Sequence, residues 1–230
     1  LVWDVDLAAG MEMEKTINTL NIENIEVVVL ANGEFPINQI PLSLLQRPIP
    51  VVCCDGAIEA LDKIGKTPLA LIGDGDSVSE ELKNKYLDRW HFIADQETND
   101  LTKAMNYCIE KGFKEVAILG ATGKREDHTL ANISLLIEYS KQVNVRMFTD
   151  YGVFVPISQT TTLSSFAKQQ VSIFSLDANN PLTSKNLRYP IENRKFKYWW
   201  EASLNEAIEK NFTLFTESEV IIYQTYEVKN

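Results

Sequence analysis

The sequence has few histidines and cysteines and no excess of basic residues. It holds only 2 His and 3 Cys, and none of them have the spacing of a zinc site. Cys53 and Cys54 are adjacent inside an apolar run, and Cys108 leaves the total odd. This usage indicates reduced, buried thiols in a cytoplasmic protein. The net charge of -10 argues against a nucleic-acid partner, whose phosphates require a basic surface. No apolar run reaches the ~18 residues that a membrane-spanning helix needs.

The remaining composition is that of an ordinary globular protein. Hydrophobic residues make up 45% and charged residues 23% of the 230 residues. Residues 1–19 show no clear pattern, and they lack the basic start and long apolar centre of a secretion signal. We therefore treat residues 1–19 as a leader of uncertain structure.

Short apolar runs alternate with segments of helical spacing up to about residue 150. The expected strands are 25–31, 49–54, 69–72, 91–94, 116–119 and 145–148. Such alternation predicts a doubly wound, mainly parallel sheet in an α/β domain covering residues 20–149.

The pattern changes after residue 150 to runs that are rich in β-branched and aromatic residues. The runs are 153–157, 171–176, 212–215 and 220–226. They predict a smaller antiparallel β-sandwich domain over residues 150–230. Residues 196–200 form the densest aromatic cluster, and core packing is the usual role of such a cluster, so we expect at least one of Trp199 and Trp200 in the core.

The acidic turn after residues 69–72 is the most informative motif. In an extended segment, residues i and i+2 point the same way, so Asp74 and Asp76 share a face. Two such carboxylates repel each other unless one is protonated or a cation lies between them. The turn is therefore either a Mg²⁺ site or a solvated acidic turn.

Other polar turns follow the remaining strands, and in parallel sheets ligands bind at this edge. Asp55 precedes Gly56, which also suits a plain turn. Asp100 begins a helix, where it is either a metal ligand or a simple N-cap. Residues 120–127 combine glycines with Arg125, which suits phosphate groups or a solvated surface turn.

Together these turns indicate Mg²⁺-dependent phosphoryl or pyrophosphoryl transfer. The sequence lacks a P-loop motif, and no Gly-x-Gly-x-x-Gly follows the first strand. A phosphatase with an Asp-x-Asp site is a rival. It requires the first Asp directly at the strand end, whereas Gly73 intervenes here, and it leaves residues 120–128 without a role.

Four motifs in order resemble the thiamine pyrophosphokinase family over roughly residues 25–226. They are Cys54-Asp55-Gly56-Ala57, Gly73-Asp74-Gly75-Asp76-Ser77, Asp95-Gln96 with Asp100 and Lys103, and Gly120-Ala121 with Arg125, Asp127 and His128. The resemblance implies transfer of a pyrophosphoryl group from ATP to thiamine, with Mg²⁺, in a homodimer whose active sites lie between subunits. A thiamine-binding protein without catalysis is the second rival.

The resemblance also implies roles for single residues. The metal ligands would be Asp74, Asp76 and Asp100, which with Asp127 form the catalytic set. ATP and its phosphates would be bound by Asp55, Gly56, Lys103, Gly120, Gly123, Arg125 and His128. Thiamine would be bound by Gln96, Tyr189, Ser203 and Asn205.

The sequence departs from the family pattern at several of these sites. Lys124 stands where glycine is usual, and Glu59 replaces a common asparagine. One extra residue, Leu204, separates Ser203 from Asn205.

Overall fold

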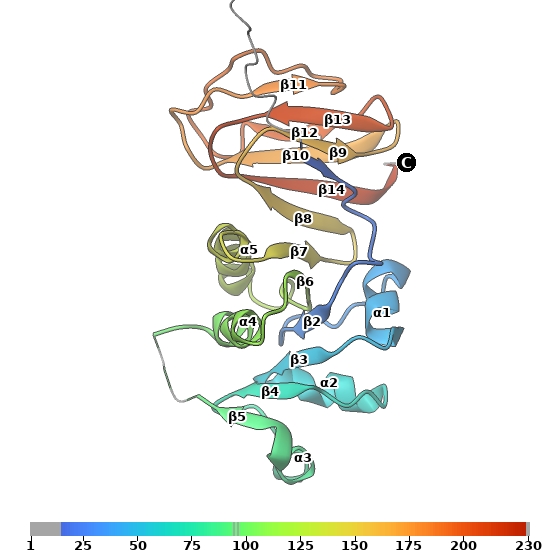
Figure 1. Ribbon diagram of the computed structural model, residues 1–230, viewed down its shortest axis with the longest axis vertical. Coiled ribbons are helices and arrows are strands. Elements are labelled where there is room, and N and C mark those ends of the chain that lie inside the picture. Colours follow the sequence, from blue (N-terminus) through green and yellow to red (C-terminus); the bar gives the residue numbers. More distant parts are fainter. Residues whose placement is uncertain (1–14, 94, 96, 229–230) are drawn as a thin grey trace, which may run out of the picture.

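A sheet of ten strands forms the centre of the computed structural model, which describes residues 15–93, 95 and 97–228 (Figure 1). The strand order is β12-β10-β14-β8-β7-β6-β2-β3-β4-β5. The last six of these strands in the order are parallel to one another. They are β2 (Val27–Leu30), β3 (Val51–Cys54), β4 (Ala70–Gly73), β5 (Trp90–Phe92), β6 (Glu115–Leu119) and β7 (Asn144–Phe148).

Helices cover both faces of the parallel strands, with α1 and α2 on one side and α4 and α5 on the other (Figure 1). Successive strand residues point to opposite faces, so Val28 joins the core with Leu44 of α1, while Val29 joins the core with Leu101 of α4. This arrangement confirms the doubly wound sheet. The helices are α1 (Gln39–Gln46), α2 (Ile58–Lys63), α3 (Glu80–Lys85), α4 (Asp100–Glu110) and α5 (Glu126–Ser140), with 3-10 turns η1 (Asp55–Ala57) and η2 (Leu87–Arg89).

The sheet continues into the C-terminal half through the antiparallel pair β7 and β8. A second sheet, of order β1-β9-β13-β11, packs on this part. Leu163 and Phe212 of the second sheet share a core with Ile173 and Ile222 of the first, which confirms the antiparallel sandwich. The strands are β1 (Lys15–Ile17), β8 (Gly152–Ile157), β9 (Thr161–Ser164), β10 (Gln169–Ser175), β11 (Thr183–Lys185), β12 (Ala202–Glu206), β13 (Asn211–Phe215) and β14 (Val220–Val228).

The expectation of a tryptophan in the core was wrong. Trp199 and Trp200 are 45% and 55% exposed, and Phe196 is the buried member of the cluster. Trp199 lies against Phe174 with the ring centroids 5.3 Å apart, and Tyr198 stacks on Trp200 at 6.0 Å. Trp199 therefore packs on Phe174 of β10, Tyr198 packs on Trp200 in the turn before β12, and both tryptophan residues stay about half exposed.

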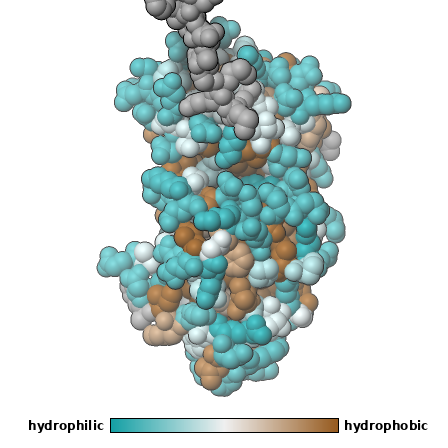
Figure 2. Space-filling view, in the orientation of Figure 1, coloured by the Kyte–Doolittle hydropathy of each residue, from teal (hydrophilic) through white to brown (hydrophobic). Residues whose placement is uncertain are grey.

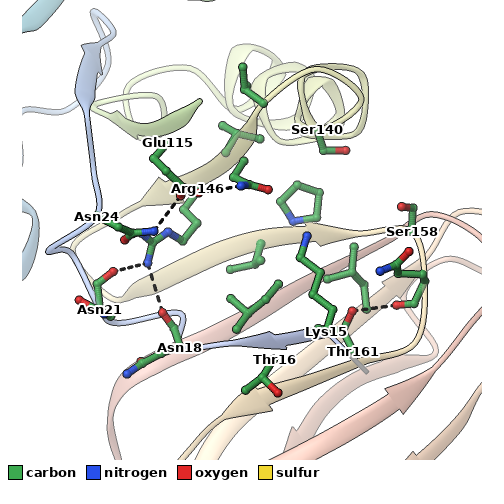
Figure 3. Close-up of a pocket in the computed structure, with 18 residues that line it drawn as sticks. Lys15, Thr16, Asn18, Asn21, Asn24, Glu115, Ser140, Arg146, Ser158 and Thr161 are labelled. Carbon is green, nitrogen blue, oxygen red and sulfur yellow. Dashed lines mark hydrogen bonds between the residues drawn. The ribbon is translucent and has the colours of Figure 1, made fainter. Parts of the chain in front are cut away.

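Buried Arg146 on β7 anchors the segment that follows β1 (Figure 3). Its Nη1 donates to the main-chain oxygens of Asn18, Thr19 and Asn21 at 3.3, 3.0 and 2.6 Å, and its Nη2 donates to the Asn24 side chain at 3.0 Å. Arg146, Asn18, Asn21 and Asn24 are among the residues that line a cavity of about 370 Å³. The guanidinium uses its hydrogen bonds to hold the chain, so the polar lining of this cavity has a structural role.

Hydrophilic residues cover most of the face seen in Figure 2, and hydrophobic residues show between them in separate places. Among the described residues, no helix has the length and apolar character needed to cross a membrane.

Candidate active site

A cleft of about 550 Å³ lies at the carboxyl ends of the parallel strands. The turns after β2, β3, β4 and β6 contribute to it, together with the starts of α4 and α5. The predicted site residues that line this one cleft are Asp55, Asp74, Asp76, Asp100, Lys103, Gly123, Arg125 and His128. Ligands of doubly wound sheets bind at this edge.

Three carboxylates come together in the cleft. Asp55, Asp74 and Asp76 each offer an oxygen, and these oxygens lie within 4.8 Å of one another. Asp55 is buried, Asp74 is half-buried and Asp76 is exposed, so the group is open on one side. Oxygen donors at this spacing suit a hard divalent cation.

The glycines of the acidic turn make this convergence possible. A side chain at Gly73 would bring its Cβ to 2.9 Å from the Cβ of Asp55, and one at Gly75 would come within 2.1 Å of the Trp90 ring. Both glycines have positive φ, at 149° and 78°. The expectation that Gly73 separates the strand from the first acid was wrong, because Gly73 is the last residue of β4 and Asp74 follows the strand directly. The same glycine makes room for Asp55.

Asp55 has the least compensated carboxylate of the three. Its Oδ2 accepts a hydrogen bond from the Ser77 N–H at 3.2 Å, whereas its buried Oδ1 has no partner among the described residues. Burial raises the pKa of Asp55, the charges of Asp100 and Asp76 add to this rise, and the hydrogen bonds from Ser77 oppose it. An unpaired oxygen on a buried acid beside two other acids fits a bound cation.

Asp100 lies in the same cleft but outside this close group of three. The N-cap of α4 is Asn99, whose side chain accepts from the Thr102 N–H at 2.8 Å, so the expected alternative of Asp100 as a plain N-cap is wrong. The Asp100 carboxylate instead accepts from Lys103 Nζ at 3.1 Å, and the Lys103 side chain is only 6% exposed. A buried lysine is thus held at the acidic end of the cleft.

The turn after β6 supplies the positive side of the cleft. Gly120 and Gly123 take positive φ there, at 63° and 75°. The Arg125 guanidinium is exposed and donates to both carboxylate oxygens of Asp127, at 3.1 and 2.5 Å. This pair holds the pKa of Asp127 below its usual range. Gly120 and Asp127 stand next to the cleft lining, and Gly56 lines a second cavity beside it.

The predicted thiamine-binding residues form a separate group on β12. Buried Asn205 accepts from the Tyr189 N–H at 3.1 Å and donates to the Tyr189 carbonyl at 2.8 Å. Leu204, the extra residue beside Ser203, sits in a bulge at φ 60° and is 79% exposed. The bulge absorbs the insertion, so that Asn205 still pairs with Val171 of β10. Gln96 lies outside the described residues.

The two groups stand far apart in a single chain. The order of the sheet places β12 seven strands away from β3, which carries Asp55 at its end (Figure 1). At about 4.8 Å per strand, the separation is roughly 34 Å. No small ligand spans that distance.

Asn132 of α5 is a cleft residue that sequence reasoning missed. Its amide donates to the Ala121 carbonyl at 2.9 Å and accepts from the Asn99 side chain at 3.2 Å, so it ties two cleft turns together. The sequence signal that could have identified Asn132 is a polar residue on the inward face of an otherwise apolar helix. Leu130, an apolar residue of the same helix, is 55% exposed.

Two family models match most of the chain. The family model for the catalytic domain of thiamin pyrophosphokinase matches residues 42–149, and the model for its substrate-binding domain matches residues 152–223. The chain belongs to the thiamin pyrophosphokinase family. Thiamin pyrophosphokinase 1 of Caenorhabditis elegans is 30% identical over 212 residues, covering 78% of this chain and 79% of that protein. Thiamine pyrophosphokinase of Bacillus subtilis is 29% identical over 152 residues, covering 60% of this chain and 68% of that protein.

Solved structures of the family share the fold. The thiamin pyrophosphokinase from Candida albicans superposes with a TM-score of 0.75 at 18% identity, covering 93% of each chain. The Bacillus subtilis enzyme gives a TM-score of 0.74 at 20% identity, covering 88% of this chain and 99% of that one. At such identities the likeness establishes the fold alone.

Proposed function

We propose that this chain transfers the pyrophosphoryl group of ATP to the hydroxyl of thiamine, giving thiamine diphosphate and AMP. The observation that supports this most is the group of Asp55, Asp74 and Asp76 in a cleft that also holds Lys103 and Arg125, in a chain of this family. Acids for a metal beside cations for phosphates are the parts that phosphoryl transfer needs.

Mg²⁺ fits the residues of the acidic end. Asp55, Asp74 and Asp76 would hold it, with Asp100 beside them, because the buried Asp55 oxygen has no other described partner. Bound Mg²⁺ would neutralise phosphate charge during transfer. Asp55 joins the metal ligands because of its place in the structure, whereas the resemblance placed it among the additional acids around metal and nucleotide.

The chain's own cations and amides would hold the triphosphate. Lys103 Nζ projects into the cleft from α4, and the Arg125 fork matches phosphate oxygens once it exchanges Asp127 for the ligand. The thiamine hydroxyl oxygen forms a bond to the β-phosphorus and releases its proton to solvent. The bond from this phosphorus to the α–β bridging oxygen breaks, and the electron pair leaves on AMP.

The distance across the sheet supports a homodimer. We place ATP binding and catalysis in residues 20–149 and thiamine binding in residues 150–230. The thiamine-binding residues would be Tyr189, Ser203 and Asn205, together with Gln96 from residues 20–149. Roughly 34 Å separates β12 from β3 in one chain, and this supports a site in which the thiamine group of one copy meets the acid group of a second copy. The reduced, buried cysteines are compatible with a cytoplasmic protein.

Mixing two inactive variants tests the shared site. Asp74→Asn removes an acid of the cleft, and Tyr189→Ala removes an aromatic ring at the other end of the sheet. After subunit exchange at equal amounts, half of the dimers are mixed and each mixed dimer holds one intact site, so activity should return to about a quarter of wild type. No recovery, with subunit exchange verified by tagged chains, would contradict a site made by two subunits.

The reaction itself is tested by ³¹P NMR of the wild-type chain with ATP, thiamine and Mg²⁺. The proposal expects AMP and thiamine diphosphate in equal amounts. Inorganic phosphate without AMP would favour the Asp-x-Asp phosphatase. Tight thiamine binding with no AMP at any Mg²⁺ concentration would favour a binding protein without catalysis.

A further inference from the structure

Lys124 has a backbone conformation that a lysine rarely adopts. Its φ is 54°, in the left-handed region that favours glycine or asparagine. It follows Gly123, which also has positive φ, and it lies one residue before Arg125. A strained position at a cleft points to a use for the side chain, and the contacts of Lys124 show what that use could be.

The Lys124 ammonium connects the turn after β6 to the turn after β2. Its Nζ donates to the Asn32 carbonyl at 3.0 Å and lies 3.4 Å from the Asn32 side-chain oxygen. An ammonium has three donors, so these two acceptors leave one N–H for a ligand. The two turns belong to neighbouring strands β2 and β6. Strand order reverses between them, and doubly wound sheets bind ligands at such a reversal.

Lys124 also lies where two cavities meet. It lines the cleft that holds the acids, and it lines a second cavity of about 450 Å³ whose lining includes Phe35, Glu59 and Lys63. Asn32 and Ser77 line both cavities as well, so the two spaces adjoin. A nucleoside triphosphate with its β- and γ-phosphates at the acids has room for its nucleoside in the second cavity. Its α-phosphate then falls at the junction.

We propose that Lys124 binds the α-phosphate of ATP and stabilises the charge that develops on AMP as it leaves. The proposal rests on the function proposed above. In that reaction the bond between the β-phosphorus and the α–β bridging oxygen breaks, and the electron pair stays on AMP. A cation at the α-phosphate interacts more strongly with the leaving AMP than with bound ATP, and therefore acts on kcat.

Lys124→Gly tests the role without endangering the fold, because glycine adopts a positive φ freely. We expect kcat/KM for ATP to fall about 10- to 100-fold, mainly through kcat, as for loss of one charge-assisted donor. The midpoint of thermal unfolding should stay the same or rise. Lys168→Gly is the matched control: Lys168 is also exposed, has φ 70°, and precedes β10 in the C-terminal half. Its thermal midpoint should likewise stay the same or rise, and its kinetics should not change.

A binding measurement separates the α-phosphate from the nucleoside. Calorimetry without Mg²⁺ should show about 10-fold weaker binding of AMP to Lys124→Gly than to wild type, with adenosine unchanged. Equal weakening of AMP and adenosine, or wild-type kcat/KM for ATP in Lys124→Gly, would overturn the assignment. If the wild-type chain makes AMP in the same assay, that result removes only the role of Lys124. A wild-type chain that makes no AMP removes the proposed function as well.

Discussion

Replacing Asp55 with asparagine should stabilise the metal-free protein and abolish its response to Mg²⁺. The buried Oδ1 of Asp55 has no hydrogen-bond partner among the described residues, and oxygens of Asp74 and Asp76 lie within 4.8 Å. An unsatisfied buried oxygen costs about 1 to 3 kcal/mol, and repulsion between the acids adds to this cost. Asparagine removes the charge and supplies an N–H that can donate to a neighbouring carboxylate. It also tolerates the φ of 34° at this position.

The free energy of unfolding of Asp55→Asn should therefore exceed that of wild type by about 1 to 2 kcal/mol. For a chain of this size the thermal midpoint should rise by roughly 2 to 8 °C. Both proteins are measured in EDTA at neutral pH and then with Mg²⁺. Binding to the folded state should raise the midpoint of wild type with Mg²⁺ and leave that of the variant unchanged. Asp88→Asn, an exposed acid outside the cleft, serves as the matched control.

The stability of Asp55→Asn relative to wild type should depend on pH. Burial raises the folded-state pKa of Asp55 above its ordinary value of 3.8, so ionisation of this group destabilises the fold. At a pH below the ordinary pKa, this shift contributes its full stability to the fold. The contribution is lost as the pH rises through the folded-state pKa. The advantage of Asp55→Asn should therefore be present at neutral pH and shrink toward zero below the ordinary value. A variant that is less stable than wild type in EDTA at neutral pH would refute the reasoning.

Three further substitutions test other parts of the site. Asp74→Asn should lower kcat by roughly 100-fold or more with little change in the unfolding midpoint, because it removes a metal ligand and one repelling charge; unchanged turnover would remove Asp74 from the metal site. Arg125→Ala should raise the KM for ATP about 10-fold or more, since a phosphate loses a bidentate partner; steady-state kinetics that show a change for thiamine alone would contradict this. Asn205→Ala leaves the Tyr189 N–H and carbonyl without their partner, so chemical denaturation should show a loss of about 2 kcal/mol and kinetics a higher KM for thiamine. A loss of stability without any change in that KM would limit Asn205 to a structural role.

Most of the parallel strands could be predicted from the sequence because they are short, mainly apolar runs between polar turns. Residues 25–31 contain β2, and residues 49–54 contain β3. The apolar pattern did not predict strands that are short or that mix apolar with polar residues. β1, β11 and β12 contain few apolar residues, and each lies at the edge of a sheet. α1 was missed because Pro41 and its short length hide its apolar stripe.

The sequence predicts which strand ends contribute residues to the candidate site. Parallel strands bring their carboxyl ends to one edge, so the sequence alone placed Asp74, Asp76 and Arg125 together. It could not rank the acids by distance. Asp55 lies closest to Asp74 and Asp76 because it sits in a left-handed turn against Gly73, and that contact depends on the three-dimensional packing of β3 on β4. The exposure of Trp199 and Trp200 likewise follows from a local turn that composition does not reveal.

We propose above that Asp55, Asp74 and Asp76 hold the metal ion of a pyrophosphoryl transfer. A crystal grown with thiamine, a non-hydrolysable ATP analogue and Mn²⁺ in place of Mg²⁺ tests it directly through anomalous scattering. We predict a peak within coordination distance of all three carboxylates and of a phosphate oxygen. A fully occupied peak that touches the nucleotide but none of these three residues would contradict the account.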